Sequence, residues 1–183
     1  MTHIDVGSVL RDSANVPYAD LVTRTTGAAV RKCIERELSE LHDGDVAFLD
    51  FSHIGMMDYS CADEVVAKLL MSPMSRHRDH GYVVFHGITD AHLEAIEDVL
   101  HHHGLALVVH FADGGARLVG AVNADERFVW EMVYAQGNSV ATLLAEVAGR
   151  EIEAMTQLLD VLYRRRLLRF DGASYSAPSL AQS

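Results

Sequence analysis

One short stretch decides the fold: Val46-Ala47-Phe48-Leu49-Asp50-Phe51, a nearly continuous apolar run. Two similar runs follow, at residues 82–86 and 105–111. Runs of this length suit strands that are covered on both faces. Between them, apolar residues recur at spacings of three and four, which is typical of amphipathic helices. The alternation predicts an α/β fold with a mixed, mostly parallel sheet.

The ends of these elements carry recognisable signals. Asp90 is placed to cap the third helix, and Gly104 is placed to end it. Asp113-Gly114-Gly115 predicts a turn into a further strand at residues 117–122. Residues 1–22 are ambiguous, with residues 6–10 a candidate edge strand.

The pattern becomes helical after Asn123. An aromatic-rich helix is expected first, then a helix through Ala148, a break at Gly149 and a helix over residues 150–165. The last stretch is typical of a two-stranded hairpin around Asp171-Gly172. Helix, turn, helix and wing is the order of a winged-helix module. We therefore predict an α/β domain over residues 1–123 and a winged-helix-like module over residues 124–183.

Composition narrows the class of protein. About half of the 183 residues are apolar, so a substantial core can be buried. The formal charge of -11 argues against a protein that coats nucleic acid, because phosphate neutralisation needs surplus lysine and arginine. The sequence has neither a signal peptide nor an apolar run long enough to span a membrane, so we expect a cytoplasmic protein.

Two motifs carry a family resemblance. Residues 49–64, LDFSHIGMMDYSCADE, resemble the signature of STAS domains, the fold of anti-sigma factor antagonists. Residues 23–31, TRTTGAAVR, are similar to the helix opening of a divergent STAS-like family. The resemblance covers roughly residues 20–122. It implies a regulatory, protein-binding role and assigns partner binding or regulation to Asp58, Ser60, Asp63 and Glu64.

Both motifs also have simpler interpretations. The resemblance implies phosphorylation at Ser60, but we favour a structural role, in which its hydroxyl caps a helix and Asp63 completes a capping box. Thr23, Arg24, Gly27 and Arg31 suit the binding of an anion or of an acidic segment of a partner. The alternative for these four residues is an N-cap with solvated arginines, and the sequence leaves both open.

No catalytic or metal centre is predicted. Adjacent helical residues point about 100° apart, so His101, His102 and His103 cannot readily bind one ion. His77 and His80 have workable spacing, but no further ligand is visible beside them. Motifs for a nucleophile elbow, a phosphate loop or a dinucleotide fold are absent from the sequence. We expect a protein that is not an enzyme and has no cofactor.

The winged-helix pattern creates a rival function, a DNA-binding regulator with a STAS-like sensor. Arg150, Arg164 and Arg165 are then the candidate DNA contacts. However, Glu151 and Glu153 lie where a DNA reader presents polar or basic groups, and carboxylates repel phosphates. Binding of a protein partner is therefore our first hypothesis, with the C-terminal module docking the partner or making a homodimer.

Overall fold

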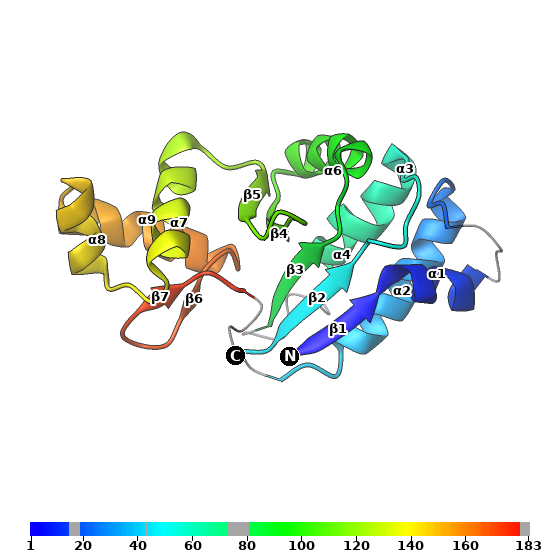
Figure 1. Ribbon diagram of the computed structural model, residues 1–183, viewed down its shortest axis with the longest axis horizontal. Helices are drawn as coiled ribbons and strands as arrows, with labels where there is room; N and C mark the ends of the chain where they lie inside the picture. The colour runs from blue at the N-terminus through cyan, green and yellow to red at the C-terminus, as the bar shows by residue number, and fades with distance from the viewer. Residues whose placement is uncertain (15–18, 43, 73–80, 180–183) are drawn as a thin grey trace.

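The computed structural model describes the chain except residues 15–18, 43, 73–80 and 180–183 (Figure 1). Within the described residues, five strands form one sheet in chain order. They are β1 (Thr2–Asp5), β2 (Val46–Asp50), β3 (Tyr82–His86), β4 (Ala106–His110) and β5 (Ala116–Gly120). The first four are parallel, and β5 is antiparallel to β4. The predicted α/β class and mostly parallel sheet are confirmed.

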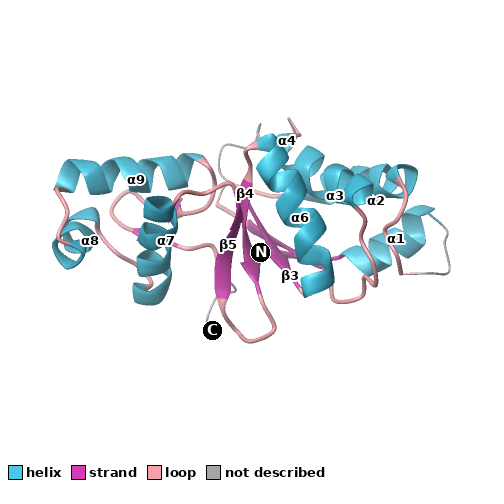
Figure 2. Ribbon diagram, turned by 90° about the horizontal axis from the view of Figure 1, so that it is seen from above, coloured by secondary structure: helices cyan, strands magenta, loops and turns pink. Residues whose placement is uncertain are grey.

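One face of the sheet is covered by helices that precede β5 in the chain (Figure 2). They are α1 (Val6–Ala14), α2 (Arg24–Leu38), α3 (Tyr59–Ala62), η1 (Asp63–Lys68), α4 (Leu69–Met71) and α6 (Asp90–His103). The segments α3, η1 and α4 follow one another directly, and η1 is a π-helix. Ile4, Leu49 and Phe85 point from the strands into this first core.

The C-terminal elements cover the other face and are α7 (Ala124–Gln136), α8 (Ala141–Ala148), α9 (Ile152–Arg164), β6 (Arg169–Phe170) and β7 (Tyr175–Ser176). Phe48 and Val84 from the sheet pack in one core with Trp130 and Leu159. The indole N–H of Trp130 donates to the Leu167 carbonyl at 2.9 Å. In the described residues, no helix combines the length and apolar character needed to cross a membrane.

Most of the predicted boundaries are confirmed. Gly104 and Gly149 end α6 and α8 in the left-handed conformation, with φ of 65° and 61°. The predicted turn joins β4 to β5, and the hairpin of β6 and β7 encloses Asp171-Gly172. Asp90, by contrast, is the first residue of α6 and not its cap. The cap is Thr89, whose backbone N–H donates to Nδ1 of His92 at 3.3 Å.

The candidate edge strand at residues 6–10 is wrong, because these residues belong to α1. The edge strand is β1, directly before them. Asp5 is the last residue of β1 and caps the start of α1. Its Oδ1 accepts hydrogen bonds from the backbone N–H groups of Gly7 and Ser8 at 2.9 and 3.2 Å. A carboxylate that satisfies the first free N–H groups of a helix stabilises its start.

The shared core generates a stability prediction. Leu159→Ala should lower the free energy of unfolding by about 2–5 kcal/mol, because Leu159 is fully buried against the sheet. Urea unfolding followed by Trp130 fluorescence and by far-ultraviolet circular dichroism should give one shared, lowered midpoint.

The control is Leu143→Ala on α8, where the leucine is exposed and its loss should leave the midpoint close to wild type. Separate transitions for the two probes would mean that the C-terminal elements fold independently of the sheet.

Candidate functional site

The helix that carries the second motif is capped by Asp58. Its Oδ1 accepts from the backbone N–H of Cys61 at 2.8 Å and from the Ser60 hydroxyl at 2.9 Å. Asp58 has an extended backbone and directly precedes α3, whereas Ser60 lies within the first turn. The expected cap at Ser60 is therefore wrong, because the carboxylate two residues earlier already occupies that position.

Asp63 and Glu64 form a buried acid pair at the start of η1. Their exposed fractions are 8% and 4%. Nη1 of Arg24 lies 2.9 Å from Oδ2 of Asp63 and 3.1 Å from Oε1 of Glu64. Nε of Arg31 lies 3.3 Å from Oε2 of Glu64. The carboxylate of Asp63 is therefore part of a tertiary ion cluster and does not complete a capping box with Ser60.

Two further side chains complete this ion cluster. Nζ of Lys68 pairs with Glu64 and lies 3.5 Å from Oδ2 of Asp63. Nε2 of His103, from the end of α6, lies 2.9 Å from Oδ1 of Asp63. Burial raises the pKa of each acid, but hydrogen bonds from these side chains and the arginines outweigh burial and hold both pKa values below the ordinary range. The two acids are therefore ionised at neutral pH.

The first motif supplies the opposite side of the ion cluster. Thr23 caps α2 by accepting from the backbone N–H of Thr26 at 3.2 Å, so the predicted N-cap is confirmed. A Cβ on Gly27 would lie 3.2 Å from Cα of Cys61, which shows how closely α2 approaches α3. Arg24 and Arg31 do bind carboxylates, but the acidic segment belongs to this chain. The alternative of solvated arginines therefore holds only in part, because both arginines are paired within the chain while the Arg24 side chain is 53% exposed.

Exposed apolar side chains lie beside this cluster. Val22, Met56 and Tyr59 form what we call the Met56 patch; Met56 is 64% exposed and Tyr59 is 44% exposed. Backbone hydrogen bonds join the two segments, since the N–H of Leu21 donates to the Met56 carbonyl at 2.7 Å. The N–H of Asp58 donates back to the Leu21 carbonyl at 3.0 Å. The patch therefore rests on fixed backbone, next to the cap of α3.

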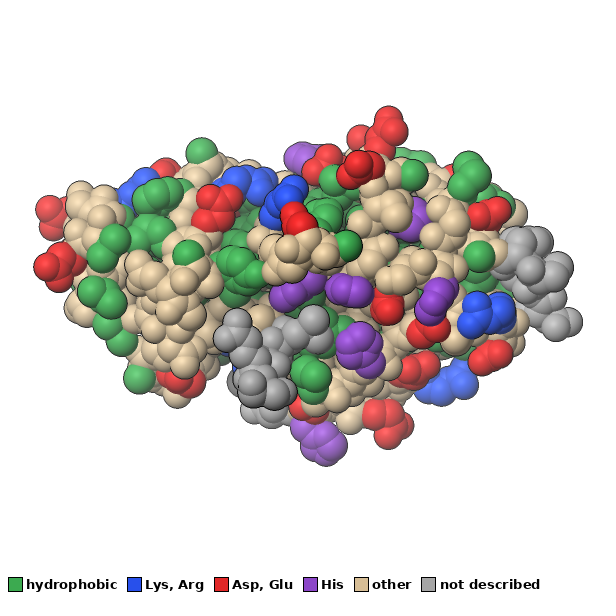
Figure 3. Space-filling view, viewed as in Figure 1, with side chains coloured by type: hydrophobic (Ala, Val, Ile, Leu, Met, Phe, Trp, Pro, Cys, Tyr) green, Lys and Arg blue, Asp and Glu red, His purple; other side chains and the backbone are tan. Residues whose placement is uncertain are grey.

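A second polar cluster was not predicted from the sequence. Asp5, Asp50, His86 and His110 are the last residues of the four parallel strands and are in register with one another. By strand alternation they share the face that carries Phe48. We call them the strand-end row. Figure 3 shows several histidine side chains near the middle of the molecular surface in view. The available signal was that each of the four strand sequences ends in aspartate or histidine.

The strand-end row is held by hydrogen bonds. Nδ1 of His53 lies 3.2 Å from Oδ2 of Asp5, and Nδ1 of His86 lies 3.4 Å from Oδ1 of Asp50. Burial raises the pKa of each aspartate, but the net shift is a lowering. Hydrogen bonds from the following serines lower both pKa values, helped by the charge of His53 at Asp5 and by a hydrogen bond from His86 at Asp50. His110 is buried edge-on against Phe48 at 6.0 Å, and burial lowers its pKa. The carboxylates are therefore ionised, and the His110 ring is mainly neutral at pH 7.

The candidate DNA contacts are largely used within the chain. Arg150 pairs with Asp125 at 2.5 Å. Arg165 pairs with Glu126 at 2.8 Å. Arg164 is exposed and pairs with Asp160 one helical turn earlier. Two of the three arginines thus hold α9 to the start of α7, and they do not form an open basic surface.

The clustered histidines have separate contacts. His103 belongs to the ion cluster, whereas Nδ1 of His101 lies 2.8 Å from the Glu97 carbonyl. His77 and His80 lie outside the described residues. Among the residues that the structure does describe, no group of three histidine, cysteine or acidic side chains is arranged to hold a metal ion.

Comparisons with known proteins do not assign the chain to a family. No model of a protein family matches the chain, and a comparison with curated proteins gives no match either. The resemblance to STAS domains therefore stays a prediction that depends on the two motifs, and the site is described from its own geometry.

The ion cluster generates a pH prediction. Glu64→Gln should lower the free energy of unfolding at pH 7 by about 1–2 kcal/mol, because it leaves arginine and lysine groups without their carboxylate. A carboxylate with a lowered pKa stabilises the fold above its ordinary pKa, and this contribution is lost as the pH falls below about 4. The difference between variant and wild type should therefore shrink at about pH 3.

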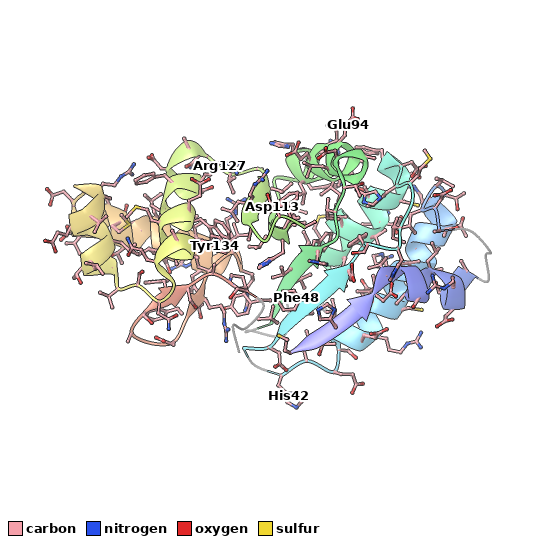
Figure 4. All side chains as sticks on the ribbon, in the orientation of Figure 1. His42, Phe48, Glu94, Asp113, Arg127 and Tyr134 are labelled. Atoms are coloured by element: carbon pink, nitrogen blue, oxygen red, sulfur yellow. The ribbon has the colours of Figure 1, made fainter. Side chains whose placement is uncertain are left out.

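Urea unfolding at both pH values measures this difference. The matched control is Glu94→Gln, an exposed glutamate on α6 that Figure 4 labels, and it should change stability little at either pH. Equal destabilisation by Glu64→Gln at both pH values would show that the cluster contributes no charge-dependent stability.

Proposed function

We propose that this chain is a non-catalytic regulatory protein that acts by binding another protein. In this proposal residues 1–123 are a STAS-like domain, and residues 124–183 are a winged-helix-like module packed on it. Support for the STAS-like assignment comes from the two motifs, whose residues meet in the ion cluster between α2 and η1. The module is proposed to help dock the partner or to pair two copies of the chain.

The observation that carries this proposal is the Met56 patch. Large apolar side chains exposed together favour association, because their burial against a partner removes apolar surface from water. A flexible methionine adapts to different partner shapes, and tyrosine is enriched at the energetic centres of interfaces. Asp58 and Ser60 lie directly beside the patch and can add hydrogen bonds at its rim.

The buried acid pair supports the patch indirectly. Asp63 and Glu64 are covered by cations of the same chain, so we assign them to positioning the helix and not to direct partner contact. The Ser60 hydroxyl lies 2.9 Å from the Asp58 carboxylate. A phosphate on Ser60 would therefore face a negative charge at close range. We propose partner binding that does not require phosphorylation of Ser60.

We expect a covalent map of the surface to locate the partner at the Met56 patch. Tyr59→p-benzoylphenylalanine, photolysed in the source cell, should give one discrete cross-linked product. Met56→Asp in the same chain should reduce the yield of this product by about tenfold or more. A charge buried in an apolar interface weakens binding about as much as the removal of one strongly contributing side chain does. Mass spectrometry of the product identifies the partner.

The matched control is Val147→p-benzoylphenylalanine on α8, because Val147 is 59% exposed and apolar but distant in sequence from the patch. The proposal fails if Tyr59 gives no discrete product, or if Met56→Asp leaves the Tyr59 product unchanged.

For the rival function we predict only weak, non-specific DNA binding near physiological salt, with dissociation constants of about 10⁻⁴–10⁻⁶ M. Ion pairs within the chain occupy Arg150 and Arg165, which reduces the cationic surface that phosphate contacts need. A salt series with genomic fragments, coupled to selection of enriched sequences, measures this. A reproducible motif that is lost in Arg150→Ala but kept in Ser60→Ala would establish the DNA-binding function instead.

A further inference from the structure

We propose that a groove between the sheet and the C-terminal hairpin binds a small, flat organic anion. We call it the hairpin groove, and its volume is about 960 Å³. Its lining includes His86, His110, Phe111, Tyr134, Arg169 and Ser176. This size falls within the range of small-molecule sites, roughly 300–1,000 Å³.

Charge is the first argument for an anion. The whole chain carries a formal charge of -11, yet none of the described residues that line the groove is an aspartate or a glutamate. The lining instead includes the cation of Arg169, together with His86, Asn138 and Ser176, which can donate hydrogen bonds. Asp50 lies behind the lining, where its carboxylate is hydrogen-bonded to Nδ1 of His86 at 3.4 Å. An anion in the groove therefore meets less repulsion than it would beside unpaired carboxylates.

The donors in the groove are positioned before any ligand arrives. The guanidinium of Arg169 lies over the Tyr82 ring at 5.9 Å and donates to the Gly44 carbonyl at 3.4 Å. A guanidinium has five N–H donors in a planar fork that fits a carboxylate or a phosphate, so donors remain after this contact. His86 is oriented by Asp50 through Nδ1, which leaves Nε2 as its other ring nitrogen.

The backbone beside His86 also needs a special residue. Gly87 has a φ of 69°, and a Cβ there would lie 2.2 Å from the Ser52 hydroxyl and 2.7 Å from Oδ1 of Asp50. Glycine therefore lets the loop after β3 close onto the Asp50–His86 pair. The carboxyl ends of β3 and β4 reach the groove through His86 and His110, and open α/β sheets usually bind ligands at such strand ends. Arg169 approaches from the other side, where it contacts Gly44 and Tyr82 at the amino ends of β2 and β3.

The shape of the wall favours a flat ligand. Tyr134 lines the groove, and its ring stacks on Trp130 with centroids 5.2 Å apart and an interplanar angle of 7°. Phe111 adds a second aromatic side chain to the lining. In Figure 4, the labels of Tyr134 on α7 and Phe48 on β2 show where the C-terminal elements and the sheet lie. Aromatic walls with a few charged donors suit an aryl carboxylate or an aryl phosphate.

The stack provides an internal probe, because Trp130 is the only tryptophan of the chain. Phenyl phosphate and benzoate are titrated while Trp130 fluorescence is followed, and calorimetry checks each titration. Phenol is the uncharged analogue of phenyl phosphate, and benzamide is the uncharged analogue of benzoate; each is called the neutral twin of its anion. We expect saturable binding of at least one anion and at least about tenfold weaker binding of its neutral twin, since a charge-assisted contact is lost. Whichever anion binds more tightly identifies the carboxylate or the phosphate as the natural class.

Two substitutions test the assignment to the groove. Arg169→Gln and His86→Gln should each weaken binding of the better anion by about tenfold. The matched control, Arg164→Gln, removes an exposed arginine that does not line this groove and should bind as wild type does. His86→Gln carries the test alone if Arg169→Gln fails to fold, which circular dichroism reveals.

The proposal is overturned if neither anion binds saturably up to about 10 mM, well above a typical weak-site dissociation constant. It is also overturned if the neutral twins bind as tightly as the anions, or if the folded groove variants bind as wild type does. The Met56 patch is not involved in these titrations, so their failure would leave the protein-binding proposal unaffected.

Discussion

Strands that are apolar on both sides need two covers, and this constraint organises the whole chain. In β2 the side chains alternate, so that Leu49 enters one core while Phe48 enters the other. The helices that connect the parallel strands cover the first face, and among the residues that the structure describes the C-terminal elements cover the second. Burial of the second face depends on residues from α7 and α9, such as Trp130 and Leu159. The protein is therefore layered, with the strand-end row where the parallel strands end and the ion cluster among the helices of the first cover.

Local signals predicted local structure well. The apolar run at Tyr82–His86 matches β3, and Gly104 ends a helix because only its left-handed backbone satisfies the last carbonyl groups. Signals that compete within two or three residues were harder to interpret. Asp58 and Ser60 are both good helix caps, and the sequence alone does not say which one has the extended backbone that a cap requires.

Tertiary partners explain the remaining differences. Arg24 and Asp63 are 39 residues apart in the chain, so no spacing rule relates them. Their contact exists because Gly27 allows α2 to approach α3 closely. The strand-end row was missed for the same reason, since Asp50 and His86 become neighbours only when β2 and β3 are paired in register. Periodicity finds the strands, but register depends on the packing of both faces.

The reversed direction of β5 has a consequence for α7. Arg127, near the start of α7, donates to the Leu118 carbonyl, whereas Tyr134 lies near Gly114 in the turn before β5. The helix thus runs back along the strand and carries Tyr134 to the edge where the parallel strands end. Each residue of an α-helix advances about 1.5 Å and turns about 100°. Inserting one residue between Arg127 and Tyr134 would rotate the tyrosine away from the groove, so the number of residues between them in α7 sets where the aromatic wall stands.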